Sequence, residues 1–476
     1  MSGHEHHGMK PLEGMSAYCR RGHQPGHQRD DRFGRLFPKL SPAYIPIHTL
    51  EAIGRKGGPM DGKSKNDRTD TVPVGMVFFG QFVDHDITLD ASTTFDSVVD
   101  DPGEIANVRT PTLDLDCVYG VGPEAQPYLY EQAGAFAGAK LLTGSDNPGQ
   151  AGERDHDLLR SPNGRAMIGD PRNDENRIIS QLQLAIIRFH NHVCDTLHAE
   201  DGFEGEELYE HAREETTWHY QWAVVNDFLA AMCGRPVVER ILGCGRAHYC
   251  GDTPFIPIEF SVAAYRFGHS MIPMEIQVQK GKSPLELFGA ILGGGFDALG
   301  TPDGVVDWHE LLFTPANRQV ERAQKLDLLL AGDLLDLPFI TNAENSLATR
   351  NLLRGNAFLL PGGEKVAEAI GCDPKWTAKV KKRIAKLSDA VDGALSEHGV
   401  PLWLWILAEA EVIGREESDG STKEGEALGP VGATIVAETI IGLLENDDHS
   451  YLGSNRNWSP RPEWDTLGKL VTVAQP

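Results

Sequence analysis

The segment GQFVDHDITLD (residues 80–90) directly follows an apolar run at residues 72–79. Gln81 and His85 lie four residues apart, so on a helix they share one face. Asp84 and Asp86 flank His85 and point to other sides, about 100° away at 3.6 residues per turn. One short helix can therefore serve three partners: a pocket for His85, a group beside it for Asp84 and a site behind it for Asp86.

Three further motifs carry polar residues in apolar surroundings. GDPRNDEN (169–176) places Arg172 and Glu175 three residues apart, at the mouth of a segment (178–197) whose apolar positions follow the helical period. YRFGHSMIP (265–273) holds His269 in an apolar and aromatic setting, with Arg266 one turn before it. LATRNLLRG (347–355) contains Asn351. None of these motifs is decisive alone.

Together with TPTLDLDCVYG (110–120), and in this order, the motifs resemble those of the animal-type haem peroxidases, in the bacterial branch of the peroxidase–cyclooxygenase superfamily. The resemblance runs from about residue 30 to about residue 460. It implies a mainly α fold: a single large helical domain over residues 31–476, with few short strands and haem b buried at its centre. Residues 1–30 are polar and histidine-rich and are predicted to form an N-terminal arm.

The resemblance also implies roles for individual residues. The catalytic residues on the open, distal face of the haem would be His85, Arg172 and Gln81. His269 would be the proximal iron ligand, with Asn351 as its hydrogen-bond partner and Arg266 beside it. Asp84 and Glu175 would be available for ester bonds to haem methyl groups. A methionine–vinyl link found in the relative that oxidises chloride best cannot form, because Asn176 stands at that position.

These residue types suit the chemistry of a peroxidase. Neutral imidazole is a good axial ligand, and the partner of its second nitrogen tunes the iron. A neutral histidine on the other face can move a proton from one peroxide oxygen to the other. A permanent cation such as Arg172 stabilises negative charge on the departing oxygen. An oxoferryl haem would then oxidise the donor.

The resemblance implies a structural calcium site behind the distal helix. Asp86, Thr110, Asp114 and Asp116 would ligate through their side chains and Thr112 through its carbonyl. Calcium takes six to eight such oxygens. The alternative is an ordinary turn, of which an isolated DxD pattern is more typical.

Two activities within the superfamily compete. A peroxidase would use hydrogen peroxide, in a response to oxidative stress, to oxidise phenols, aromatic amines, iodide, bromide or thiocyanate. A haem-dependent fatty-acid dioxygenase would need a tyrosine near the iron. Cyclooxygenases have that tyrosine three residues before the proximal histidine, where this sequence has Arg266, with Tyr265 one residue further back. This favours the peroxidase and leaves the dioxygenase open.

The net charge and the hydropathy of the sequence disfavour some classes of binding partner. A net charge of −25 disfavours nucleic acid and anionic membranes. No apolar run reaches the ~18–20 residues needed to span a bilayer. The N-terminus lacks the apolar core of a secretory signal, which predicts a cytoplasmic protein, with signal-less export left open. The seven cysteines form no CxxC motif, so reduced thiols are the simpler interpretation, although Cys244 and Cys250 are close enough in sequence to pair.

Local patterns predict helices over residues 178–200, 208–234, 321–336, 346–354, 377–398 and 432–445. Polar stretches at 54–72, 143–165 and 414–429 are predicted to be loops. His190 and His192 diverge on a helix and are expected to pack rather than bind metal, and Tyr119 and Trp308 are expected in the core. The segment Ser2-Gly3-His4 would suit copper or nickel if Met1 were removed, although a solvated tail explains it as well.

Overall fold

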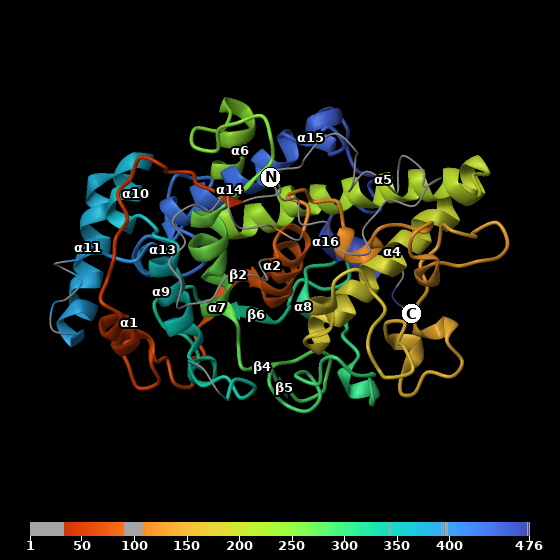
Figure 1. Ribbon diagram of the computed structural model, residues 1–476, viewed down its shortest axis with the longest axis horizontal. Helices are drawn as coiled ribbons and strands as arrows, with labels where there is room; N and C mark the ends of the chain where they lie inside the picture. The colour runs from red at the N-terminus through yellow and green to blue at the C-terminus, as the bar shows by residue number, and fades with distance from the viewer. Residues whose placement is uncertain are drawn as a thin grey trace, which may run out of the picture.

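Helix α2 (Val74–Ile87) lies at the centre of the computed structural model (Figure 1). The structure describes residues 33–89, 107, 109–341, 344–391, 393, 395, 398–473 and 475. Pro73 directly precedes α2. All but two of the side chains of α2 are buried, because the helix is apolar on nearly every side. A helix of this kind must be covered all round, so the polar residues near its C-terminal end face interior sites.

Segments distant in sequence surround α2. Strand β2 (Arg68–Pro73) leads into it and pairs antiparallel with β6 (Arg322–Gln324). Helix α4 (Arg177–Asp201), the π-helix η6 (Val224–Gly234) and α7 (Gly268–Met271) pack against it. Gly80 permits the close approach of η6, because a Cβ there would lie 2.8 Å from Cε2 of Phe228.

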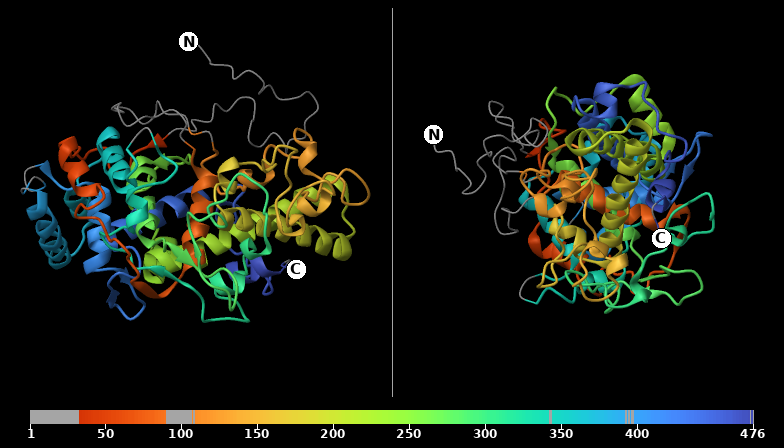
Figure 2. Two further views of the ribbon diagram at one scale, coloured as in Figure 1. Left: turned by 90° about the horizontal axis from the view of Figure 1, so that it is seen from below. Right: turned by 90° about the vertical axis from the view of Figure 1, so that its right-hand side faces the viewer.

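Helix α4 carries the chain from the site to one end of the molecule. The Asn176 side chain caps its first turn by accepting a hydrogen bond from the Ile179 amide, and Gly202 ends it with a φ of 73°. Helix α5 (Gly205–Ala223) packs beside it and continues into η6. Helices α1 (Ile47–Gly54), α10 (Gly363–Ile370) and α11 (Pro374–Ser388) lie at the opposite end (Figure 2).

The remaining elements are mostly short. The helices are α3 (Asp116–Tyr119), α6 (Arg235–Cys244), α8 (Trp308–Leu311), α9 (Leu347–Ala357), α13 (Leu402–Val412), α14 (Pro430–Glu445), α15 (Tyr451–Ser454) and α16 (Leu467–Thr472). The strands form the parallel pair β1 (Phe33–Gly34) and β3 (Ile256–Pro257), and the antiparallel pairs β4 (Glu275–Ile276) with β5 (Leu285–Glu286) and β7 (Arg415–Glu416) with β8 (Thr422–Lys423).

The mainly α fold with few short strands is confirmed. The helix predicted over 321–336 is wrong. Leu326, Leu328 and Leu330 are fully buried and alternate with more exposed residues, a period of two that suits the extended chain following β6. The predicted loop at 414–429 contains the β7–β8 hairpin, and the loop at 54–72 ends in β2. Among the described helices, none combines the length and the apolar character that crossing a bilayer requires.

Candidate active site

A cavity of about 240 Å³ opens between α2 and the turn that leads into α7. Its wall includes six residues that the sequence analysis selected: Gln81, Asp84, His85, Glu175, Arg266 and His269. The two histidines therefore face one cavity from elements more than 180 residues apart in sequence. Arg172 and Asn351 stand behind this wall and contact the histidines from there.

His85 presents a neutral imidazole to the cavity. Burial, and then the nearby charge of Arg172, lower its pKa. Its Nδ1 lies 2.7 Å from Oδ1 of Asn173, a residue inside the GDPRNDEN motif to which the sequence analysis gave no role. With Nδ1 occupied in this way, Nε2 is the nitrogen left for a ligand in the cavity.

Arg172 is held rigidly next to the distal helix. Its Nη2 donates to the carbonyls of His85 at 2.9 Å and Thr88 at 2.7 Å, and it pairs with Asp170 at 2.8 Å. Asp170 also caps the short helix η5 (Pro171–Asp174) by accepting from the Arg172 amide. The guanidinium thus contacts the backbone of His85 rather than its ring.

Two carboxylates and an amide line the cavity beside His85. The Gln81 side chain donates to Oε1 of Glu175. Asp84 accepts from the hydroxyl of Thr88 at 2.9 Å. Both carboxylates are therefore positioned at the wall of the cavity.

His269 lies on the opposite wall, in α7. Burial and then Arg266 lower its pKa to about 3, which leaves the imidazole neutral and suited to iron. Nδ1 of His269 lies 2.9 Å from Nδ2 of Asn351 in α9, and Oδ1 of Asn351 accepts from Arg266 at 3.4 Å. The predicted partner is thus in contact, but it presents its nitrogen rather than the oxygen expected of an acceptor. An imidazole that binds iron through Nε2 and carries a proton on Nδ1 requires this amide to turn over.

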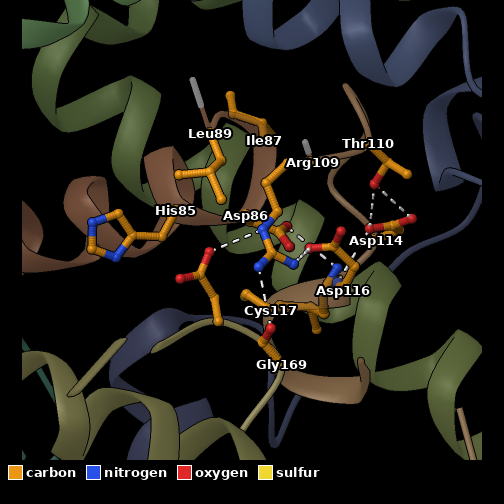
Figure 3. Close-up of polar contacts among 12 residues, drawn as sticks. His85, Asp86, Ile87, Leu89, Arg109, Thr110, Asp114, Asp116, Cys117 and Gly169 are labelled. Carbon is orange, nitrogen blue, oxygen red and sulfur yellow. Dashed lines mark hydrogen bonds and ion pairs between the residues drawn. The ribbon is translucent and has the colours of Figure 1, made fainter. Parts of the chain in front are cut away.

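Behind α2, Asp86, Asp114 and Asp116 form an acidic cluster in which one carboxylate oxygen from each residue lies within 4.8 Å of the other two (Figure 3). Figure 3 shows the His85 ring directed away from this cluster and the Asp86 carboxylate directed into it. Asp86 is fully buried, and its Oδ1 has no hydrogen-bond partner among the described residues. Burial, followed by Asp114, raises the pKa of Asp116 to about 7. The donor set therefore suits a hard cation such as calcium.

The two threonines of the predicted calcium loop lie beside the cluster. The Thr110 hydroxyl is 3.1 Å from each carboxylate oxygen of Asp114, and Thr112 is buried. The loop turns at Leu115, whose φ of 59° is in the left-handed region, and the Leu115 amide donates to Asp86 at 3.3 Å. The loop is thereby fastened directly to the distal helix.

Arg109 connects the acidic cluster to Arg172, a link that the sequence analysis missed. Its guanidinium pairs with Asp116 at 3.2 Å and with Asp170 at 2.9 Å. Asp170 in turn holds Arg172. An arginine one residue before the TPTLDLD motif was the signal available in the sequence. The chain of ion pairs makes the geometry beside His85 depend on the loop behind it.

Residues that were set aside are structural, as expected. His190 is fully buried between the hydroxyl of Tyr119 and the carbonyl of Ala139, and Trp308 is in the core. The cysteines that the structure describes are all free, including Cys244 and Cys250, which are exposed. The histidine-rich arm at 1–30, with Ser2-Gly3-His4, lies outside the described residues.

Comparison with known proteins finds a similarity to one family. A family model described as animal haem peroxidase matches residues 96–332, a range that includes the acidic loop, the GDPRNDEN motif and His269 but not His85 or Asn351. This segment of the chain is therefore similar to the animal haem peroxidase family.

Curated relatives are considerably longer than this chain. Dual oxidase 1 of Caenorhabditis elegans is 25% identical over an alignment of 319 residues that covers 59% of this chain and 20% of that protein. Chorion peroxidase of Drosophila melanogaster is 28% identical over 379 residues, 72% of this chain and 42% of the relative. The chain spans about a fifth to two-fifths of the length of such relatives.

Solved structures share the fold along almost the whole chain. Peroxidase A from Dictyostelium discoideum matches with a TM-score of 0.64 at 16% identity, covering 94% of this chain and 93% of that one. A fatty acid alpha-dioxygenase from Arabidopsis thaliana matches with a TM-score of 0.59 at 16% identity, covering 94% and 78%. At such identities these matches establish the fold alone.

Proposed function

We propose that the protein is a haem peroxidase that uses hydrogen peroxide to oxidise small donors such as phenols, aromatic amines, iodide, bromide or thiocyanate. The supporting observation is the single cavity with a neutral histidine on each wall. Haem b would be held by His269, with Asn351 behind the ligand. When bound, the haem supplies the redox chemistry that couples peroxide reduction to donor oxidation.

The distal residues supply proton transfer and charge. His85, neutral and open to the cavity at Nε2, accepts a proton from peroxide and returns it to the departing oxygen. Arg172 places a permanent positive charge beside His85 and stabilises the charge that develops there. Gln81, held by Glu175, is positioned to orient water or a halide in the cavity.

The fatty-acid dioxygenase stays as a second candidate because of Tyr265. This side chain lines the cavity, and its buried hydroxyl has no hydrogen-bond partner among the described residues. Steady-state turnover with iodide, bromide, thiocyanate, a phenol and an unsaturated fatty acid separates the two activities. Peroxide-dependent oxidation of the small donors supports the peroxidase. Oxygen consumption with the fatty acid alone would replace it with the dioxygenase.

We also propose that Asp84 and Glu175 would form ester bonds to haem methyl groups during turnover with peroxide. In each ester a carboxylate oxygen would replace one methyl hydrogen, and one peroxide would take up the two electrons and be reduced to water. Support comes from the position of both carboxylates in the cavity wall. Acid–organic extraction followed by mass spectrometry tests this: haem should be retained by the wild-type protein and released at free mass by the double variant Asp84→Asn, Glu175→Gln. Complete release from peroxide-treated wild type would show that the carboxylates only hydrogen-bond near the haem.

A structural calcium ion at the acidic cluster completes the proposal. Asp86, Asp114 and Asp116 converge there, and the carboxylate of Asp86 is incompletely hydrogen-bonded. The ion would offset the repulsion among the three carboxylates, of which Asp86 is fully buried, and hold the loop at 110–116 against α2. The alternative is a turn neutralised by Arg109 alone.

A further inference from the structure

A line of buried amide groups runs away from His85 into the protein. Nδ1 of His85 contacts Oδ1 of Asn173 at 2.7 Å, and Nδ2 of Asn173 donates to Oε1 of Gln183 at 2.8 Å. Nε2 of Gln183 donates to the carbonyl oxygen of Cys117 at 3.2 Å. Asn173 and Gln183 are both 0% exposed, so water does not compete for these contacts.

The direction of every hydrogen bond in this line follows from its last member. A backbone carbonyl can only accept, so Gln183 must present its NH2 group to Cys117 and its oxygen to Asn173. Asn173 must then present its NH2 group to Gln183 and its oxygen to His85. An amide oxygen can only accept, so Nδ1 of a neutral His85 must carry the proton. Reversing either amide would place two acceptors or two donors in contact without water.

We propose that Asn173 and Gln183 are positioning residues that fix His85 in the tautomer with its proton on Nδ1 and its lone pair on Nε2, directed into the cavity. The assignment of Nε2 as the base rests on the proposed function, whereas the tautomer does not. The second nitrogen of a histidine commonly sets the state of the first through its own hydrogen bond. Here the tautomer of His85 is determined by the backbone carbonyl of Cys117, which acts through Gln183 and Asn173.

The same line connects the distal base to the acidic loop. Cys117 directly follows Asp116, and its carbonyl also accepts from the Asp170 amide at 3.1 Å. Gln183 lies on α4, which packs against α2. His85 is thereby connected by hydrogen bonds to helix α4 and to the acidic loop, in addition to its own helix.

The direct test is the tautomer of His85 in the holoprotein. Long-range 1H–15N correlation spectra of 15N-histidine protein in the diamagnetic ferrous–carbonyl form distinguish a protonated Nδ1 from a protonated Nε2, and His85→Gln assigns the signal. The wild type should show the proton on Nδ1. A wild-type proton on Nε2 overturns the proposal, whatever the protein turns over. A protein with the expected tautomer and no peroxide turnover would instead fail the proposed function.

Variants test which residues set the tautomer. Asn173→Leu removes the acceptor and should give the Nε2 tautomer or a mixture, and should slow cyanide binding to the ferric protein roughly 10- to 100-fold, because bound HCN also needs a proton acceptor. Asn173→Asp retains an acceptor and should restore the Nδ1 proton and most of the rate. Gln183→Met frees the Asn173 amide and should give a mixture, which decides the matter if Asn173→Leu does not fold.

Gln181→Met is the matched control. Gln181 is a buried amide on the same helix, 5% exposed, and donates to the carbonyl of His156 instead of entering the line. It should keep the wild-type tautomer and rate. A wild-type tautomer and cyanide rate in folded Asn173→Leu and Gln183→Met would show that neither residue positions His85.

Discussion

His85 and His269 face one cavity, and each holds an asparagine at Nδ1, yet the two asparagines are turned in opposite directions. Asn173 offers His85 its oxygen, and its orientation is imposed by Gln183 and a carbonyl. Asn351 offers His269 its nitrogen, because its oxygen accepts from Arg266. The contacts around His85 therefore already fit its proposed role in proton transfer. The proposed role of His269, with iron at Nε2 and a proton on Nδ1, would require the Asn351 amide to turn over.

The two asparagines show that the tautomer of a histidine depends on how its hydrogen-bond partner is oriented, and not only on which residue lies beside it. An asparagine can donate or accept, so its identity alone does not determine the tautomer of a histidine. The second contact of the asparagine makes that choice. For Asn173 this contact is uncharged and buried, and for Asn351 it is Arg266, which lines the cavity.

The largest effect is expected for His269→Ala. Loss of the ligand should abolish stable haem binding, or leave a spectrum without histidine-ligated iron, measured by the Soret band after reconstitution. His192→Gln is the control. His192 lies on α4, outside the cavity, and packs against Trp464, so this substitution should leave haem binding intact. A His269→Ala protein with the wild-type Soret band and high-spin signature would assign the iron to another residue.

His85→Ala should keep the haem and lose the chemistry. Without the distal base, the reaction with peroxide should slow roughly 10²–10⁴-fold in stopped-flow measurements. Arg172→Ala should also slow it, and because Arg172 holds the carbonyls of His85 and Thr88, it should disturb the end of α2 as well. Reaction of either variant at the wild-type rate would remove that residue from the distal machinery.

Removal of calcium should affect the two sides unequally. Chelation should lower the Tm of the wild type by several degrees, because an ion bound only to the folded state stabilises it. Cyanide and peroxide reactions should slow, while the spectral signature of proximal histidine ligation remains, since the loop of the acidic cluster is attached to α2 through the Leu115 amide and Asp86.

Asp114→Ala should have a lower Tm than the wild type and should no longer respond to the chelator. Asp155→Ala, which alters a carboxylate that is 70% exposed and outside the cluster, should behave as wild type. Unchanged melting and activity in Asp114→Ala would show that residues 110–116 form only a turn.

The smallest effect concerns the polarity of the proximal amide. Asn351→Asp replaces an amide that can turn with an acceptor, which should make the imidazole more electron-donating and lower the ferric–ferrous potential, by on the order of tens of millivolts. Asn351→Leu should shift the potential less and loosen the haem. Equal potentials in Asn351→Asp and the wild type, by spectroelectrochemistry, would show that Asn351 does not tune the iron.

The parts of the fold that sequence predicted are those with strong local patterns. Helix α4 has a long apolar period and an asparagine cap, so its prediction over 178–200 differs from the observed Arg177–Asp201 only at the ends. The error at 321–336 arose because the spacing of the leucines in this segment is compatible with a helix. In the structure the segment is an extended chain, and its leucines alternate with more exposed residues. The pairing of that chain with β2 is set by residues 250 positions away and is invisible locally.

The sequence motifs predicted the side chains that line the site. They did not predict the residues that hydrogen-bond to those side chains and so determine their tautomer or orientation. Motifs selected six polar residues in the wall of the cavity and the three carboxylates that converge behind it. Their roles in binding and catalysis stay predictions until tested. Asn173 was quoted within its motif and given no role, because only the fold brings it to His85. Arg109 was missed since its two partners, Asp116 and Asp170, meet it only in three dimensions.

The order in which the chain is synthesised has a consequence for loading the cofactor. The cavity takes its walls from α2 and α7, and the residue behind the second wall, Asn351, comes 266 positions after His85. An emerging polypeptide therefore exposes apolar faces of α2 until the later segments that cover them, such as η6 and α7, have been made, and contacts so distant in sequence form late. Under the proposed function, haem could be enclosed only after synthesis has passed Asn351, so folding and cofactor supply would have to be matched in any cell that makes this protein.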